Sequence, residues 1–235
     1  MILFIKHITT EGPETLGEFF KKQKFPTKII ELGNGGSLPK DFNYIDAVIS
    51  LGGPMNVYEE QKNPFLKKED DFIREVLIRE IPFLGICLGS QLLAKASGGK
   101  VIKSPNEEIG FFKVQFTEEG KCDNLFAGIS PEITVFQWHE DMFLPSVKAN
   151  LLARSERCPN QAFKIGKCAY GLQFHVEVTG ETIANWADDY LPKNIELSRI
   201  KKQEMLDSYN KSKSEFDSEA FKIYTNFLNI IKNNK

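Results

Sequence analysis

Residues 81–96 read IPFLGICLGSQLLAKA, in which a short apolar run leads through a turn with two glycines into a helical pattern. A step from buried strand to helix is the repeating unit of a parallel sheet covered by helices. The same alternation fills the chain before this stretch. Its apolar runs and helical patterns cover residues 2–5, 16–20, 28–31, 47–51 and 64–79.

From residue 110 onward the pattern changes to short strands divided by turns, expected at residues 111–116, 133–138, 151–154, 161–165 and 169–176. The tail, residues 182–235, turns helical again, and packing on the rest of the chain is favoured over docking a partner. The sequence therefore predicts an α/β fold: a flavodoxin-like, mostly parallel sheet with helices on both faces, mixed or antiparallel strands in the second half, and a C-terminal helical extension. We expect one domain, 1–235, with a core of about residues 1–180 and an extension of about 181–235.

Composition excludes several classes of protein. The 235 residues are 41% hydrophobic and 26% charged, as in an ordinary globular chain. The formal net charge of −2 leaves no basic excess for phosphates, so we expect no nucleic-acid partner. The apolar N-terminal run is too short for a signal peptide, and no segment approaches the roughly 18 apolar residues of a membrane span. We therefore expect a cytoplasmic protein without membrane contact.

The strongest chemical signal is G-x-C-x-G at residues 85–89, the nucleophile-elbow pattern with Cys87 in the place of serine. Glycines flank the nucleophile because side chains would clash around so sharp a turn. The helix N-terminus that follows favours a thiolate. An ordinary buried cysteine near a glycine turn is the alternative interpretation.

A cysteine nucleophile needs a base, and the chain offers His7, His139 and His175. On an extended strand, His175 and Glu177 would point to the same face because the side-chain period is two. Glu177 could then orient one imidazole nitrogen while the other faces the thiol. Alone, His-x-Glu on a strand is more often an exposed polar pair. His7 follows the first strand, and we expect it to be structural although it could reach the same sheet edge.

Residues 51–54, Leu-Gly-Gly-Pro, directly follow an expected strand. Glycine there would let backbone N–H groups approach a ligand at the carboxyl edge of the sheet, where sites form in α/β folds. Alone, the motif is also a plain turn.

Together these motifs resemble those of the class I, or triad-type, glutamine amidotransferases. Residues 50–54 (SLGGP), 85–91 (GICLGSQ) and 171–177 (GLQFHVE) are similar, in order, to the family's oxyanion, nucleophile and histidine boxes. Residues 108–111 (EIGF) are similar to its E-[IL]-G-[WY] stretch. The resemblance covers about residues 45–180, and Val176 replaces the family's usual proline.

The resemblance implies Cys87 as nucleophile, His175 as general base and acid, and Glu177 as the residue that orients His175. The backbone and substrate contacts that it implies are the N–H groups of Gly53 and Leu88 for the oxyanion and Gln91 for the backbone end of glutamine.

Residues 138–141, WHED, resemble the W-H-x-D stretch of free-standing members, such as the glutaminase domain of GMP synthase. Glu140 stands where a glycine usually follows the histidine. The resemblance implies that Trp138 and His139 line the substrate pocket. A core tryptophan beside an exposed histidine fits the sequence equally well.

The expected reaction is hydrolysis of the γ-amide of L-glutamine, or of a related γ-glutamyl compound, through a cysteine thioester. As an amidotransferase subunit, the protein would pass ammonia to a separate synthetase subunit, because no synthetase domain is recognised in the sequence. The absence of an ATP-binding motif fits this version and a free-standing hydrolase equally. The alternatives are a free-standing γ-glutamyl peptide hydrolase and a non-catalytic binding module of the same fold. No cofactor is implied. Cysteine spacing suggests neither a zinc site nor a disulfide framework, so Cys122, Cys158 and Cys168 are expected to be packing or surface thiols.

Overall fold

The computed structural model describes residues 1–193 and 195–234. In these residues the first part of the sheet is parallel, with strands β1 (Ile2–Lys6), β2 (Thr27–Glu31), β3 (Ala47–Ser50), β4 (Phe83–Ile86) and β9 (Ala169–Leu172). Their order is β2-β1-β3-β4-β9. Parallel neighbours require crossover connections. Helix α1 (Glu14–Lys22) joins β1 to β2, α2 (Phe65–Ile78) joins β3 to β4, and α3 (Leu88–Ala96) follows β4.

The three central strands β3, β4 and β9 are buried along their whole length. Their residues are nearly all apolar or small because helices cover both faces of a parallel sheet and leave no side in water. The carboxyl ends of β3 and β4 lie next to each other, as their register shows, so the loops after these two strands meet at one edge. The predicted parallel half of the sheet is confirmed.

Antiparallel strands continue the sheet beyond β9, in the order β8 (Ala162–Ile165), β7 (Ala149–Arg154), β5 (Lys100–Phe116) and β6 (Glu132–Leu144). The predicted antiparallel character is confirmed, but β5 and β6 are much longer than expected. The two strands pair with each other along most of this added length. A bulge between Lys103 and Glu108 interrupts the register. The polar residues at 103–108 concealed this strand, because they break the apolar alternation by which a strand is recognised. Helix α4 (Glu118–Cys122) and the 3₁₀ helix η1 (Asn124–Phe126) connect β5 to β6.

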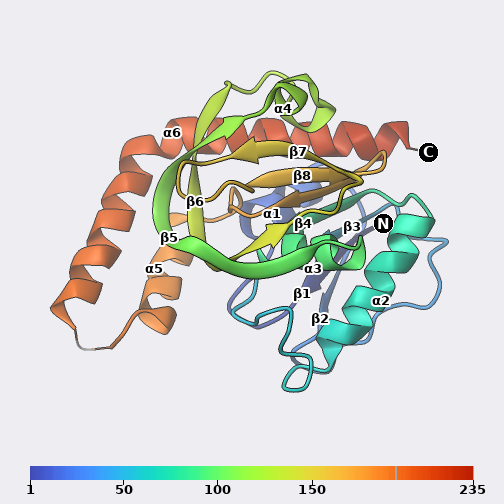
Figure 1. Ribbon diagram of the computed structural model, residues 1–235, viewed down its shortest axis with the longest axis horizontal. Helices are drawn as coiled ribbons and strands as arrows, with labels where there is room; N and C mark the ends of the chain where they lie inside the picture. The colour runs from blue at the N-terminus through green and yellow to red at the C-terminus, as the bar shows by residue number, and fades with distance from the viewer. Residues whose placement is uncertain (194, 235) are drawn as a thin grey trace.

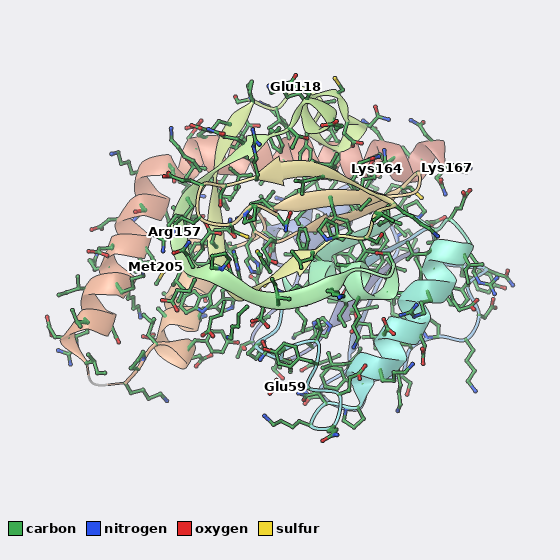
Figure 2. The ribbon with its side chains drawn as sticks, in the orientation of Figure 1. Glu59, Glu118, Arg157, Lys164, Lys167 and Met205 are labelled. Carbon is green, nitrogen blue, oxygen red and sulfur yellow. The ribbon has the colours of Figure 1, made fainter. Side chains whose placement is uncertain are left out.

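The C-terminal part forms helices α5 (Gly180–Tyr190) and α6 (Glu196–Asn233), as predicted. Figure 1 shows that α6 first runs beside α5 and then changes direction to pass behind the antiparallel strands. Met205, labelled in Figure 2, lies in the first half of α6, is 2% exposed and belongs to a hydrophobic cluster against which Ile109 and Phe111 of β5 pack. Asn194 and Lys235 of the expected helical tail lie outside the described residues.

Each face of the sheet has its own hydrophobic core. Phe20 of α1 and Phe227 of α6 belong to the core on one face, and Ile73 of α2 and Leu92 of α3 belong to the core on the other. A third cluster, which includes Trp186, joins α5 and the first half of α6 to β5 and β6. No helix among the described residues is both long and apolar enough to cross a membrane.

Replacing Phe227 with alanine tests whether the end of α6 is part of this core. Phe227 has no exposed surface, so Phe227→Ala is expected to lower the free energy of unfolding by about 3–5 kcal/mol. Phe221 lies on the same helix but is 57% exposed, so Phe221→Ala should cost less than about 1 kcal/mol. Urea denaturation followed by circular dichroism measures both values. Equal losses in the two variants would contradict the packing of α6 described above.

Candidate active site

Cys87 occupies the sharp turn between β4 and α3. Its backbone has φ +49° and ψ −106°, a conformation that costs a non-glycine residue on the order of 1–3 kcal/mol. A Cβ on Gly85 would lie 2.5 Å from the backbone of Gly89, and one on Gly89 would lie 2.1 Å from the carbonyl oxygen of Ser50. Glycine is therefore required on both sides of Cys87, as the nucleophile-elbow pattern predicts.

His175 lies between Glu177 and Cys87. Its Nδ1 is 2.6 Å from Glu177 Oε1, and Cys87 lies close enough to the same ring to raise its pKa, which leaves Nε2 to face the sulfur. The Val176 N–H donates to the other carboxylate oxygen, Oε2, at 2.9 Å. A proline at position 176 could not form this hydrogen bond, because proline has no N–H. The sequence-predicted nucleophile, base and orienting residue thus come together in space.

The pKa of His175 is held well above its ordinary value. Burial by itself would lower this pKa, because an imidazolium loses its solvation. The negative charge of Glu177 and the hydrogen bonds with Cys87 and Glu177 raise it, and together they outweigh burial.

The backbone around His175 differs from the prediction. The expected strand 169–176 ends at Leu172, so the two-residue period of a strand does not explain why His175 and Glu177 meet. Beyond Leu172 the chain leaves β4, and His175 forms an isolated bridge to Phe136 of β6. The His175 N–H donates to the Phe136 carbonyl at 2.8 Å. The strand assignment beyond Leu172 is wrong, because the chain turns there toward the antiparallel half of the sheet.

Two helices hold this segment in place. Thr15 of α1 donates its backbone N–H and its hydroxyl to the Glu177 carbonyl, at 3.2 and 2.8 Å. Tyr224 of α6 donates its hydroxyl to the Val176 carbonyl at 2.9 Å. The C-terminal helix therefore fixes the backbone beside His175.

Gly53 and Leu88 belong to two segments that are tied together beside Cys87. The Gly89 N–H donates to the Leu51 carbonyl at 3.1 Å, which fixes the turn against the loop after β3. A Cβ on Gly53 would lie 2.9 Å from the Leu88 side chain. Among the described residues, neither the Gly53 N–H nor the Leu88 N–H has a hydrogen-bond acceptor. Both donors are available to an anion.

A cavity of about 590 Å³ opens in front of Cys87 and His175. Its wall includes the buried carboxyl groups of Glu11 and Asp141 and the indole of Trp186. Of the described residues that line it, none is a lysine or an arginine. The wall thus favours a ligand that carries a positive charge.

The predicted substrate contacts Gln91, Trp138 and His139 all line this cavity. Gln91 Nε2 donates to the Asp141 carbonyl at 3.2 Å and to Gln173 Oε1 at 3.3 Å. The Cys87 thiol lies 3.8 Å from the Trp138 carbonyl oxygen. Gln91 and Trp138 therefore help to shape the space around the sulfur.

His139 is buried rather than exposed. Its Nδ1 lies 3.0 Å from the Asp141 carbonyl, and its Nε2 lies 3.0 Å from Glu108 Oε2. Because both ring nitrogens are engaged within the fold, His139 can offer a ligand only the surface of its ring. The structure therefore supports a part for His139 in positioning β6.

Two buried acidic residues of the cavity wall were not predicted as site residues. Glu11 lies in the loop after β1, where Tyr190 donates its hydroxyl to Oε1 at 2.8 Å. Burial raises the pKa of Glu11, although the charge of His175 partly opposes this. Its position after a parallel strand was the available signal, since such loops gather at one sheet edge. Asp141 lies within the WHED stretch, but only the pairing of β6 brings it to the cavity.

Glu108, His139 and Cys158 lie close enough together to be considered as metal ligands. Both oxygens of Glu108 already accept hydrogen bonds, Oε1 from Ser155 and Oε2 from Gln161. Burial raises the pKa of Cys158 to about 11, so its sulfur stays protonated near neutral pH. These residues fit a hydrogen-bonded interior better than a metal centre.

Comparison with known proteins places this geometry in a family. The model of the class-I glutamine amidotransferase family matches residues 22–188. The glutamine amidotransferase-like protein YfeJ of Salmonella typhimurium is 35% identical over 152 residues, which are 63% of this chain and 64% of YfeJ. One subunit of the glutamine-hydrolysing GMP synthase of Sulfurisphaera tokodaii is 38% identical over 135 residues, 57% of this chain and 68% of that protein. The match thus spans slightly less than two thirds of YfeJ.

The solved structure of a glutamine amidotransferase from Thermotoga maritima has a TM-score of 0.87 and 33% sequence identity, and the match covers 98% of this chain and 97% of that one. A glutamine amidotransferase structure from Methylobacillus flagellatus shares the fold, with a TM-score of 0.88, 24% identity and coverage of 97% and 94%. With the predicted motifs, the fold and the family match in agreement, this chain belongs to the class-I glutamine amidotransferase family.

Proposed function

We propose that this protein hydrolyses the γ-amide of glutamine through a covalent γ-glutamyl thioester on Cys87. The observation that carries the proposal is the meeting of the strained Cys87 turn with the His175–Glu177 pair at one cavity. A nucleophile, its base and a group that orients the base are the parts that covalent acyl transfer requires.

At the start of the reaction the proton shared by Cys87 and His175 lies on His175 Nε2, and the Cys87 thiolate attacks the amide carbon. Glu177 holds the ring by Nδ1 and stabilises the imidazolium. The carbonyl oxygen becomes an oxyanion and accepts hydrogen bonds from the backbone N–H groups of Gly53 and Leu88. One such donor contributes about 3–4 kcal/mol of transition-state stabilisation.

In the second step the tetrahedral adduct collapses and the carbon–nitrogen bond breaks. The imidazolium of His175 protonates the nitrogen, which leaves as ammonia, and the thioester on Cys87 remains. Water then attacks the thioester while His175 accepts its proton. Breakdown of this second adduct expels the Cys87 thiolate and releases glutamate, so the enzyme ends as it began, with the proton on His175.

The cavity wall suggests how glutamine is held. Asp141 lines the same cavity as Cys87 and is 4% exposed, and we assign its carboxylate to the α-ammonium group of the substrate. Lys103 lies 3.5 Å from Asp141 but is itself paired with exposed Glu140 at 2.6 Å. Gln91, whose Nε2 is already engaged, presents Oε1 to the same end of the substrate.

Two destinations for the nitrogen follow from different observations. Relatives that are named as one subunit of a glutamine-hydrolysing GMP synthase favour transfer of ammonia to a separate synthetase chain. The cavity of about 590 Å³ lies in the range that holds drug-sized ligands and exceeds what glutamine fills, which favours a larger γ-glutamyl compound. Activity of the isolated chain on each substrate separates the two.

Replacement of the proposed nucleophile is the first test. Cys87→Ala should abolish ammonia release from L-glutamine and cleavage of a γ-glutamyl dipeptide, since removing a triad nucleophile costs on the order of 10⁶-fold in turnover. Cys122→Ala is the matched control, because Cys122 is exposed and far along the chain from the site. Glutamine turnover alone indicates an amidotransferase subunit, and dipeptide cleavage alone a hydrolase. Residual turnover in Cys87→Ala with an unchanged melting temperature would exclude the thioester mechanism.

The charge of Glu177 can be tested through the titration of His175. Glu177→Gln keeps a hydrogen-bond acceptor but removes the charge that raises the pKa of His175, so its titration midpoint should move to lower pH. The midpoint moves to lower pH because the carboxylate that is lost stabilised the protonated form of the ring. Imidazole NMR in a Cys87→Ala background measures the midpoint, and the three histidines give few signals to assign. A midpoint that stays or rises would contradict the proposed pairing.

If Asp141 binds the substrate, its replacement should change KM and leave kcat nearly unchanged. Asp141→Asn should raise KM for glutamine about 10- to 100-fold and leave kcat within a few-fold, because a charge-assisted hydrogen bond of about 1.5–3 kcal/mol is lost from ground and transition states alike. Glu140→Gln, at the neighbouring exposed position, is the matched control. Steady-state kinetics of both variants measures KM and kcat. A fall in kcat with unchanged KM would contradict a role of Asp141 in substrate binding.

A further inference from the structure

Another buried histidine, His7, lies against the loop after β3. His7 has no exposed surface, and its Nδ1 lies 2.8 Å from the Gly52 carbonyl oxygen. Its Nε2 lies 2.8 Å from Glu69 Oε2. The other oxygen of Glu69 accepts the Ser50 hydroxyl at 2.7 Å. The four residues form a closed hydrogen-bond network behind the loop, and the proposed mechanism uses none of its side chains.

The contact with Gly52 bears on Gly53 through the geometry of the peptide bond. The Gly52 carbonyl and the Gly53 N–H belong to the same planar peptide unit, and in a trans peptide they point in opposite directions. A donor that fixes the carbonyl on one side therefore fixes the N–H on the other. His7 is that donor, since a carbonyl oxygen can only accept.

The loop needs such a constraint because it is built from glycine. A Cβ on Gly52 would lie 2.6 Å from Glu11 Oε2, and a Cβ on Gly53 would lie 2.9 Å from Leu88 and 3.1 Å from His7. A side chain at either position would push these neighbours aside, yet two successive glycines leave the peptide between them free to rotate. The orientation of the Gly53 N–H must therefore come from outside the loop.

The charge state of His7 strengthens its hydrogen bond to the Gly52 carbonyl oxygen. Both ring nitrogens face acceptors, which suits a doubly protonated ring beside the Glu69 carboxylate. Burial alone would lower the pKa of His7, but the charge and hydrogen bond of Glu69 and the Gly52 carbonyl raise it overall. The imidazolium cannot turn away from Gly52 without breaking a buried ion pair.

We infer that His7 is a positioning residue, which holds the Gly52–Gly53 peptide so that the Gly53 N–H faces the oxyanion, while Glu69 and Ser50 hold His7. This inference rests on the proposed function, in which Gly53 supplies one of two oxyanion donors. The donor is then oriented by the chain's own interior, without a partner subunit.

The test compares two variants in a Glu69→Gln background, so that no unpaired carboxylate stays buried. In that background His7→Leu removes the donor to Gly52, and His7→Asn keeps an N–H at the place of Nδ1. The leucine variant should lose kcat on glutamine by 10-fold or more, up to the roughly 10²–10³-fold of a lost oxyanion donor. KM should change little, and the asparagine variant should recover most of the loss.

Alkylation of Cys87 by iodoacetamide separates positioning from general damage. This displacement forms no oxyanion, so its rate should be the same in the leucine variant as in the Glu69→Gln background. If alkylation and melting temperature fall together with kcat, His7 has only a structural role and the inference is overturned. Unchanged kcat in the leucine variant would also overturn it.

A crystal structure of the unmodified protein with a γ-aldehyde analogue of glutamine bound to Cys87 needs no variant to fold. We expect the oxygen of the hemithioacetal to accept the Gly53 N–H while the Gly52 carbonyl stays on His7. A Gly52 carbonyl that leaves His7 when the adduct forms would contradict the inference. Failure of Cys87 to form an adduct would instead count against the proposed function. The orientation of the peptide in crystals of the leucine variant would then decide the role of His7, and an unchanged orientation would overturn it.

Discussion

At the junction of β4 and α3, the carboxyl end of β3 approaches the turn so closely that only glycine fits. A Cβ on Gly89 would meet the Ser50 carbonyl oxygen at 2.1 Å, and one on Gly85 would meet the backbone of Gly89 at 2.5 Å. This contact forces Cys87 into a positive φ and aims its side chain at the cavity. It also places the loop after β3 beside the sulfur, so the position of the oxyanion donors depends on the packing of the same two strands.

The antiparallel half of the sheet completes the site from the other side. A bridge between Phe136 and His175 carries the histidine segment away from β9, and the same strand, β6, supplies Trp138 and Asp141 to the cavity wall. Helix α6 then holds the segment through the hydrogen bond from Tyr224 to Val176. The C-terminal helix is thus part of the support of the site, which gives a physical reason for its extensive burial against the sheet.

Buried charges in this protein occur in pairs with distinct surroundings. His175 with Glu177 borders the cavity, whereas His7 with Glu69 is sealed behind the loop after β3. Removing one member of such a pair leaves an uncompensated charge, so each pair holds its backbone neighbours firmly. Glu11, whose carboxyl group is bonded by Tyr190, adds a further buried acid next to the catalytic histidine. The cavity lining is consequently acidic, and its acids lie near two positive charges, that of the proposed base beside Glu11 and that of Lys103, 3.5 Å from Asp141.

The sequence by itself determined the parallel half of the fold and the Cys87 turn, and its motifs singled out Cys87, His175 and Glu177 as a set. The fold pattern and the turn are local, since apolar periodicity marks strands and helices, and glycine spacing marks a turn that excludes side chains. The meeting of the three side chains is not local, because the bridge from His175 to Phe136 sets it. Only the tertiary structure decided the length of β5 and β6, the end of β9 at Leu172, and the places of Glu11 and Asp141. It also decided that His7 holds the Gly52 carbonyl, because that contact joins residues 45 positions apart and depends on how β1 and β3 pair.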